Sequence, residues 1–540
     1  MPEQRRFLLL WAVIMAAGAL AVATLGRYGL HVFAFGLLYG SLATAWSLLR
    51  ATGLFSLGHA AFFGVGALMQ AWLVTTGNTS PWLAFAASAL VGAVSALPLI
   101  PALRLEPASF ALATLAYAIL LKGLAGNVPG IGMEGFLLPV TPALSGASPA
   151  IAAMLAALAL GLCLSYEQFL NSSAGRSAAA IRQSPETAIS LGMDLLGERW
   201  RPLMLSGAAT ALAGALYGHL VGSVEVAVVF SPVFSVLPLV TGMLGGALHP
   251  LGGILGTLAL YPLDELILRP ALPQAHALAY GLALVLLLLW RPAGLLRARI
   301  PGIPSAVGTR HASHVPFALA VRHLSARREG TVVLRDVTLA VEPGEILRVI
   351  GPNGAGKTSL LLAIAGRISD TEGAILFGGR PSPRRAAARA RRGLARSFQA
   401  PRPFPEWTVR ENVALAATLS GSPDHVDALL ADLQLTSLGD RPAGLLSVGE
   451  GKRLELARVL ASRPAVLLLD EPLAGLSPEA AERLSGLIAQ TARAGAAVIW
   501  LEHGPAAGLA SQVLVLEGGR IRYSGLPSGW DAARRESSSS

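Results

Sequence analysis

Long apolar runs recur through the first 299 residues, and short polar or charged segments separate them. Most runs approach the roughly 20 residues that an α-helix needs to cross about 30 Å of hydrocarbon. Because backbone amides inside lipid must bond within their own segment, each run is expected to be a helix. The run at Ser235–Leu248 is short and ends at His249-Pro250, so the pattern predicts about nine or ten membrane spans. The runs are Phe7–Leu25, Leu30–Leu49, Leu54–Thr76, Pro81–Leu103, Ala108–Ala125, Ser148–Leu170, Leu203–Ser223, Ser235–Leu248, Gly252–Leu268 and His276–Trp290.

The pattern changes near residue 300. Residues 300–316 hold several prolines and glycines, which is typical of a linker between domains. From Phe317 onward, short β-branched runs alternate with helical patterns, an order typical of an α/β domain. We therefore expect a polytopic α-helical membrane domain at 1–299, an α/β domain at 317–530 and a disordered tail at 531–540. Strands are expected at Val332–Val341, Glu345–Ile350, Ala374–Phe377, Val466–Leu469, Ala497–Leu501 and Gln512–Leu516.

Composition narrows the class of protein. Hydrophobic residues make up 53% of the chain and charged residues 14%, which excludes intrinsic disorder and argues against a wholly soluble protein. The single cysteine, Cys163, excludes an internal disulfide and a cysteine-rich zinc site. The net charge of +10 is spread along the chain rather than gathered in one block, so we expect contact with a lipid bilayer and no contact with nucleic acid.

Arginines between the apolar runs indicate an orientation in the membrane. If the N-terminus is cytoplasmic and ten spans alternate, most arginines, among them Arg50, Arg104 and Arg182, fall on the cytoplasmic side, as the positive-inside rule requires. The domain at 317–530 is then cytoplasmic as well. Arg5 and Arg6 precede the first run as in a signal peptide, but the run is long and lacks a clear cleavage site, so we interpret it as a retained anchor.

One glycine-rich segment follows the strand expected to end at Ile350 and opens an apolar helix. It fits the phosphate-loop pattern GxxxxGK[ST], whose glycines let backbone N–H groups converge on phosphate oxygens, while the helix N-terminus favours an anion. Lys357 can reach the β- and γ-phosphates of a nucleotide, and the Thr358 hydroxyl can ligate Mg²⁺. The residues expected to bind nucleotide here are Gly351, Pro352, Asn353, Gly354, Ala355, Gly356, Lys357, Thr358 and Ser359.

A second apolar strand, Val466–Leu469, ends in two carboxylates. Asp470 can hold the Mg²⁺ shell, and Glu471 can polarise an attacking water. Such an ending is common when it stands alone. Its place downstream of a phosphate loop favours nucleotide hydrolysis.

Three further segments identify a family. LSVGE at 446–450 opens a helical pattern and resembles the ABC signature, SFQ at 397–399 resembles the Q-loop, and His503 after the strand Ala497–Leu501 resembles the switch histidine. Residues 317–530 therefore resemble the nucleotide-binding domain of ABC transporters.

That resemblance implies ATP and Mg²⁺ as cofactors and an ATP hydrolase coupled to transmembrane solute transport. It also implies roles for individual residues: Gln399 joins Thr358 and Asp470 at the metal, and His503 acts with Glu471 and Lys357 in catalysis. The signature residues of such a domain contact the ATP held by another ATPase domain. Here they are Ser447, Gly449 and Glu450.

Further segments resemble one branch of that family. RSFQAPRPFPEWTVREN at 396–412 and RLELAR at 453–458 are similar to the ATPase subunit of branched-chain amino acid importers. TGLFSLGHAAFFGVGA at 52–67 and VTGMLGG at 240–246 are similar to their permease subunits, and the polar loop at 175–192 resembles their cytoplasmic coupling loop. We expect this loop to dock on the ATPase domain near Gln399.

The chain departs from the family pattern in three places. Val448 replaces the first glycine of LSGGQ, Glu450 replaces its glutamine, and Arg328 stands near the position of the aromatic residue that stacks on adenine. A guanidinium plane can also stack on a base. Whether Arg328 does so stays open at the level of sequence.

The resemblance implies a fused permease and ATPase of an importer for branched-chain or other small amphipathic amino acids, in the bacterial inner membrane. Three alternatives remain: uptake of urea or short amides by the same mechanism, an ABC exporter half-transporter, and a membrane sensor whose ATPase acts only as a switch. One permease and one ATPase cannot close an ABC site, so we expect a second permease and a second ATPase of the same family, or a second copy of this chain. A periplasmic or extracellular solute-binding protein is the remaining expected partner.

Overall fold

The computed structural model describes residues 2–128, 135–139, 144, 146–271, 294–298, 302, 316–421, 425–502 and 509–529, with scattered positions between 273 and 290. The chain divides into two compact units. Unit 1 comprises Met1–Arg182 and Leu195–Pro301, and unit 2 comprises Gln183–Asp194 and Gly302–Ser540. The predicted tail at 531–540, most of the predicted linker at 300–316 and most of the predicted run His276–Trp290 lie outside the described residues.

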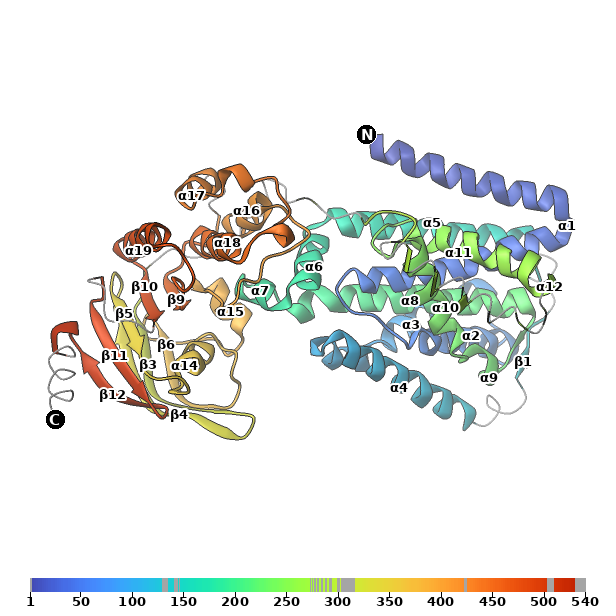
Figure 1. The fold of residues 1–540 in the computed structure, drawn as a ribbon. Helices are drawn as coiled ribbons and strands as arrows, with labels where there is room; N and C mark the ends of the chain where they lie inside the picture. Colours follow the sequence, from blue (N-terminus) through green and yellow to red (C-terminus); the bar gives the residue numbers. More distant parts are fainter. Residues whose placement is uncertain are drawn as a thin grey trace. The chain divides into compact units, whose positions relative to one another are not determined.

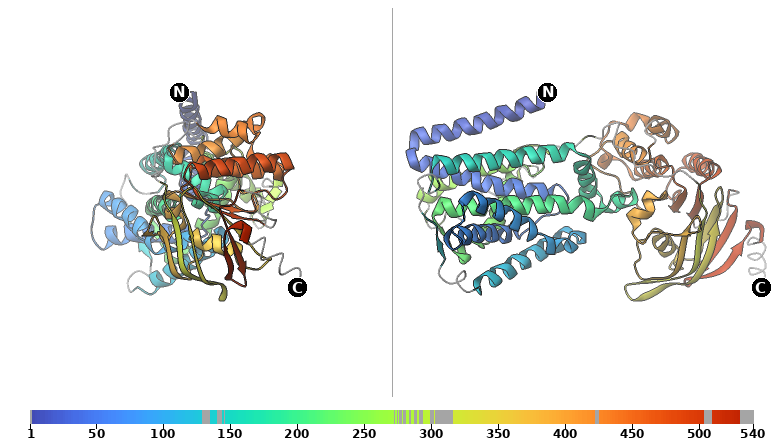
Figure 2. Two further views of the ribbon diagram at one scale, coloured as in Figure 1. Left: turned by 90° about the vertical axis from the view of Figure 1, so that its left-hand side faces the viewer. Right: turned by 180° about the vertical axis from the view of Figure 1, so that it is seen from behind.

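Unit 1 is helical, and its main helices run alongside one another in Figure 1 and in the right-hand view of Figure 2. Its longer helices are α1 (Pro2–Arg50), α2 (His59–Thr75), α3 (Pro81–Val94), α4 (Pro107–Gly126), α5 (Pro149–Asn171), α6 (Ser173–Gln183), α8 (Leu195–Val221), α10 (Val233–Gly245) and α11 (Gly252–Leu263). Shorter elements are α9 (Val226–Val229), α12 (Arg269–Ala271), a π-helical turn at Asp264–Leu268, 3-10 turns at Leu97–Leu99 and Pro101–Arg104, and the paired strands β1 (Phe136–Leu137) and β2 (Ser223–Val224).

Six helices in the described residues are long and apolar enough to cross a membrane. The longest covers Leu9–Arg50, 42 residues, which at about 1.5 Å per residue is twice the thickness of the hydrocarbon core. Gly26 interrupts it with non-helical backbone angles (φ 59°, ψ −134°), and Figure 1 shows α1 bent sharply. The two runs predicted at Phe7–Leu25 and Leu30–Leu49 are therefore the two arms of one kinked element.

Other predicted runs also differ from the observed helices in their bounds. The run Leu54–Thr76 becomes the shorter helix α2, because residues 51–53 form a turn with Gly53 at a positive φ of 89° and residues 54–58 are not helical. The short run Ser235–Leu248 belongs to a longer candidate span, Val226–Gly245, which α9 and α10 form together. The expected interruption at His249-Pro250 thus follows the helix.

The core of unit 1 combines aromatic packing with a few polar bonds. Phe63 and Phe234 stack with ring centroids 3.9 Å apart, and Tyr217 meets both rings. The buried His59 bonds Ser206 through Nε2 at 3.0 Å. Apolar side chains on α4, such as Leu112 and Ile119, are instead exposed, as expected of a helix that faces lipid.

Unit 2 is built on a six-stranded sheet and a four-stranded antiparallel sheet. The larger sheet has the order β12-β11-β5-β10-β9-β8, and its pairs are parallel except for β11 with β12. The smaller sheet has the order β4-β3-β6-β7. The strands are β3 (Leu319–Arg328), β4 (Thr331–Val341), β5 (Ile346–Ile350), β6 (Thr371–Phe377), β7 (Arg380–Pro381), β8 (Leu394–Arg396), β9 (Val466–Asp470), β10 (Ala497–Leu501), β11 (Gln512–Glu517) and β12 (Arg520–Gly525).

Helices cover these sheets, and all six expected strands are present. The helices of unit 2 are α7 (Pro185–Ser190), α14 (Lys357–Ile364), α15 (Ala386–Arg391), α16 (Val409–Leu419), α17 (Val426–Asp432), α18 (Val448–Ala461) and α19 (Pro478–Arg493). The central strands β5, β9 and β10 are buried almost throughout, as parallel strands covered on both faces must be. The carboxyl ends of β5 and β9 carry the predicted phosphate loop and the predicted carboxylates.

Candidate nucleotide-binding site

The phosphate loop connects β5 to α14, as the sequence predicts. Its glycines adopt backbone angles that other residues rarely reach, with φ of 80° at Gly354 and 99° at Gly356. A Cβ on Gly356 would lie 2.7 Å from the carbonyl oxygen of Val333, so a side chain cannot be added there without moving the backbone. The loop is therefore held in a curled form between β5 and the N-terminus of α14.

Lys357 begins α14 and is largely buried. Its Nζ donates to the carbonyl oxygens of Gly351 at 2.6 Å and Pro352 at 3.0 Å. Burial lowers the pKa of the ammonium group, while the nearby carboxylates Glu471 and Asp470 raise it. These carbonyl bonds hold the positive charge beside the loop that is to receive phosphate oxygens.

Asp470 and Glu471 end strand β9. Asp470 is only 2% exposed, and its backbone N–H donates to the Ser397 hydroxyl at 3.0 Å. Glu471 has a positive φ of 48° and donates its N–H to the Leu501 carbonyl at 3.1 Å. A non-glycine residue in this region is strained, and such strain gathers at functional sites. The turn after β9 thus fixes the direction in which the Glu471 side chain leaves the sheet.

The Q-loop segment reaches the same place from the neighbouring strand. Strand β8 pairs in parallel with β9, and the Ser397 N–H continues the ladder by donating to the Leu468 carbonyl at 2.9 Å. Gln399 therefore lies beside Asp470, although 71 positions separate them in the sequence.

A cavity of about 490 Å³ brings the predicted metal ligands together, because Thr358, Gln399 and Asp470 all line it. They offer a hydroxyl, an amide oxygen and a carboxylate, the hard oxygen donors that suit Mg²⁺. The residues present therefore fit a magnesium ion bound together with nucleotide phosphates. The cationic side chains lining the same cavity are Arg327, Arg328, Arg367, Arg396 and Arg402, which favour an anionic ligand.

Arg328 is the last residue of β3 and lines the cavity with Thr358. The structure thus places the arginine within the site where the family pattern has an aromatic residue. A guanidinium plane is available for stacking on a base.

The signature residues lie elsewhere. Ser447 caps the N-terminus of α18: its hydroxyl accepts from the Glu450 N–H at 3.3 Å and donates to the Glu450 carboxylate at 2.8 Å. These bonds from Ser447 lower the pKa of Glu450. Val448 is 74% exposed, and a Cβ on Gly449 would meet no atom within 4 Å. None of these residues lines the cavity that holds Thr358.

The predicted coupling loop supplies a carboxylate to the cavity. Glu186 of α7 lines it, pairs with Arg367 at 3.1 Å and also pairs with Arg402. The Thr187 hydroxyl donates to the Arg402 carbonyl at 2.8 Å. This confirms the predicted docking near Gln399. The sequence singled out the loop but not these partners, since only the fold brings α7 to residues 367 and 402.

The predicted switch histidine, His503, lies outside the described residues, as do its neighbours up to residue 508.

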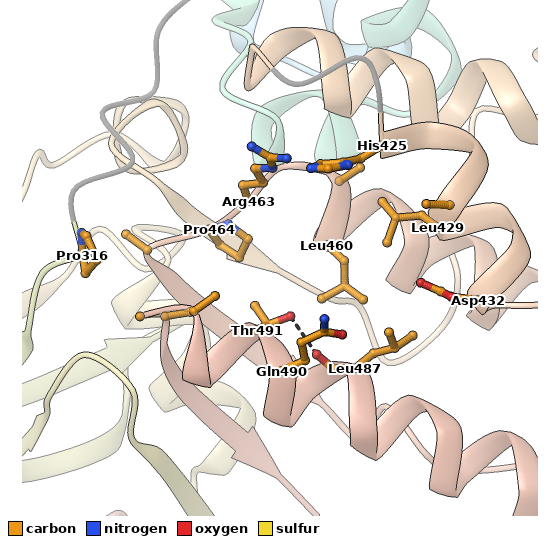
Figure 3. Close-up of a pocket in the computed structure, with 16 residues that line it drawn as sticks. Pro316, His425, Leu429, Asp432, Leu460, Arg463, Pro464, Leu487, Gln490 and Thr491 are labelled. Carbon is orange, nitrogen blue, oxygen red and sulfur yellow. Dashed lines mark hydrogen bonds between the residues drawn. The ribbon is translucent and has the colours of Figure 1, made fainter.

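A larger cavity of about 600 Å³ lies between α17, α19 and the segment after α18 (Figure 3). Its lining includes the polar side chains of Arg463 and His425 and leucines such as Leu429 and Leu460. None of the predicted site residues lines it, so the smaller cavity, which Thr358, Gln399 and Asp470 line, is the candidate nucleotide site.

The comparisons with known proteins agree with both halves of the chain. Residues 28–290 match the model of the permease component of the branched-chain amino acid transport system, and residues 334–474 match the ABC transporter model. The high-affinity branched-chain amino acid transport ATP-binding protein BraF of Pseudomonas aeruginosa is 34% identical over 207 residues, which are 34% of this chain and 81% of BraF.

Other relatives of the ATPase half have names that do not mention branched-chain amino acids. A probable ABC transporter ATP-binding protein of Azorhizobium caulinodans is 33% identical over 39% of this chain and 78% of its own length. The lipopolysaccharide export system ATP-binding protein LptB of Acidithiobacillus ferridurans is 34% identical over 36% of this chain and 85% of its own length. The ATPase half is thus similar to a protein of an export system as well as to proteins whose names give transport without a direction.

A multi-pass membrane permease and an ATPase that hydrolyses ATP to drive transport are therefore joined in one polypeptide. The chain belongs to the ABC transporter family, as a branched-chain amino acid type permease fused to its ATP-binding domain.

Proposed function

We propose that this chain is the fused permease and ATPase subunit of an importer that uses ATP to move branched-chain or other small amphipathic amino acids into the cell. The observation that carries the proposal is the match of residues 28–290 to the permease component of the branched-chain amino acid transport system, on the same chain as an ATPase. Uptake of urea or short amides by the same mechanism is the second candidate for the solute.

The chemistry we assign is in-line attack of water on the γ-phosphate of ATP. The backbone of the loop Gly351–Thr358 and the Lys357 ammonium bind the phosphates, and Glu471 orients the water. Thr358, Gln399 and Asp470 would hold Mg²⁺, which would supply positive charge to the phosphates when bound. We assign His503 to the γ-phosphate from the sequence alone.

The separate positions of the two predicted nucleotide-binding motifs support an assembly with two ATPase domains. Ser447 caps the N-terminus of α18, where Val448 is exposed, so we assign Ser447, Gly449 and Glu450 to the ATP of a second ATPase domain. We infer a hetero-assembly with a second permease and a second ATPase of the same family, rather than a homodimer, together with a periplasmic or extracellular solute-binding protein. We place the permease, residues 1–299, in the bacterial inner membrane and the ATPase domain, residues 317–530, in the cytoplasm.

Reconstitution into proteoliposomes tests the proposal. The chain, with its co-purifying subunits, is embedded so that the ATPase domains face the lumen, and ATP is enclosed with an ATP-regenerating system. We expect labelled leucine, supplied with the binding protein, to accumulate inside only with ATP, and Lys357→Ala to abolish accumulation. Accumulation of urea instead would favour the second solute class. ATP-driven loss of preloaded solute would indicate an exporter, and hydrolysis without solute movement would contradict the transport proposal.

A further inference from the structure

The backbone of Arg402 is held from two sides by side chains of two different helices. Its carbonyl oxygen accepts from the Thr187 hydroxyl of α7 at 2.8 Å and from Nη1 of Arg458 of α18 at 3.0 Å. Its N–H donates to Oε2 of Glu455, also on α18, at 3.1 Å. One peptide segment thus joins the helix of the predicted coupling loop to the helix that begins at the signature.

The segment from Phe398 to Arg402 has no regular secondary structure, so it depends on side chains for its backbone hydrogen bonds. Glu455 supplies them at both ends, because its other carboxylate oxygen accepts from the Phe398 N–H. Gln399, assigned to the metal, lies between these two anchored positions. The segment is therefore fixed to α18 rather than to the sheet from which it emerges.

The two anchoring side chains are deeply buried, at 3% exposure for Glu455 and 1% for Arg458. Burial raises the pKa of Glu455, and the charge of Arg458 and the two backbone N–H groups act in the opposite direction. Buried charges contribute little net stability compared with apolar side chains of similar volume. Stability alone therefore does not account for this pair, whereas the position of the Arg402 backbone does.

We propose that Glu455 and Arg458 are positioning residues that make α18 follow α7 through the backbone of Arg402. This inference rests on the proposed function, because it concerns how a signal from the permease reaches hydrolysis. A displacement of α7 shifts Arg402, and α18 moves with it, so the signature at Ser447 changes its position toward the ATP of the second ATPase. The permease then acts on the opposite nucleotide site through α18, in addition to its own site through Gln399.

The first test compares hydrolysis in the reconstituted assembly. Thr187→Val removes one hydroxyl with little change of volume, and Glu455→Gln keeps the side-chain volume but removes one acceptor. We expect each variant to lower the ratio of solute-stimulated to basal ATP hydrolysis about fivefold or more, with the KM for ATP unchanged. Arg453→Ala is the control on the same helix, because Arg453 bonds the carbonyls of Leu433 and Gln434 instead.

The double variant decides whether the two residues share one route. If they do, Thr187→Val with Glu455→Gln lowers the stimulation ratio no further than either change alone. Effects that multiply would overturn the inference, and so would single variants that keep the wild-type ratio. A wild-type assembly in which no solute stimulates hydrolysis would count against the proposed function instead.

A second measurement does not depend on the solute. The only native cysteine, Cys163, is buried, so spin labels can be placed at Ser190→Cys on α7 and Lys452→Cys on α18. Pulsed electron paramagnetic resonance on the full chain should give a narrow label-to-label distance distribution with and without ATP. Glu455→Gln should broaden it. An equally narrow distribution in Glu455→Gln would show that Glu455 does not tie α18 to α7.

Discussion

We assign nucleotide contact to two parts of this chain, the phosphate loop and the signature segment, and they differ in how deeply they are buried. The loop is packed against its own domain, with Lys357 largely buried and bonded to the carbonyls of Gly351 and Pro352. The signature is presented to solvent, with Val448 74% exposed and Ser447 capping only its own helix. We infer that the phosphate loop forms one side of a nucleotide site and that the signature forms the other side of a site in a partner.

The largest expected effect concerns ATP turnover at the phosphate-loop site. Glu471→Gln keeps the shape of the side chain but removes the charge that orients water, so turnover should fall by a factor on the order of 10² or more while ATP still binds. Steady-state hydrolysis and equilibrium binding of a labelled ATP analogue measure the two quantities. Glu479→Gln, an exposed carboxylate in the first turn of α19, is the control. Wild-type turnover in Glu471→Gln would remove Glu471 from the water-orienting role.

A change in the signature segment should lower ATP turnover without changing the affinity of the phosphate loop for ATP. Ser447→Ala removes the hydroxyl assigned to the opposite γ-phosphate, and we expect hydrolysis by the assembly to fall about tenfold at an unchanged ATP affinity of the phosphate loop. The loss of the cap also costs about 1 kcal/mol of stability. Thr408→Ala removes the matching cap of α16, which has the same capping box, and so reproduces that cost alone. Equal losses of hydrolysis in both variants would mean that Ser447 only caps its helix.

A substitution of Arg328 should have a smaller effect, on ATP binding at the phosphate-loop site. If its guanidinium stacks on adenine, Arg328→Ala should weaken ATP binding about fivefold and Arg328→Tyr should restore it. Binding of ATP and of inorganic triphosphate, measured side by side, separates base contact from charge, because only ATP carries the base. Arg322→Ala on the same strand is the control, since Arg322 is exposed and does not line the cavity. Equal weakening of ATP and triphosphate binding by Arg328→Ala would indicate a purely electrostatic role.

The smallest effect concerns pH and the carboxylate inside the signature helix. Burial raises the pKa of Glu455, so the folded protein binds this proton more tightly than the unfolded chain does. Protonated Glu455 contributes its full stabilisation below the ordinary glutamate pKa. That stabilisation is lost as pH rises through the raised pKa of the folded state. Glu455→Gln should remove this loss, which amounts to at most about 2–4 °C in unfolding temperature per pH unit. Melting curves between pH 5 and pH 8 that change in parallel for both proteins would contradict the expectation.

The sequence determined the elements whose signals are local. Apolar length predicts the spans that become α4 and α5, and the glycine spacing of 351–358 predicts a loop between a strand and a helix. The helical turn of α18 likewise follows from a serine cap three residues before Glu450. In each case the residues that cause the structure lie within one turn or one strand of it.

Only the tertiary structure decided which of these elements meet. Parallel pairing of β8 with β9 brings Gln399 to Asp470, and the docking of α7 brings Glu186 to Arg402 from 216 residues away. In the sequence, Glu455 and Arg458 look like the polar positions of an ordinary amphipathic helix. A charged residue in a sequence does not reveal which backbone groups its side chain will bond. Hydrogen-bond partners are set by the packing of whole elements, and that packing depends on the entire chain at once.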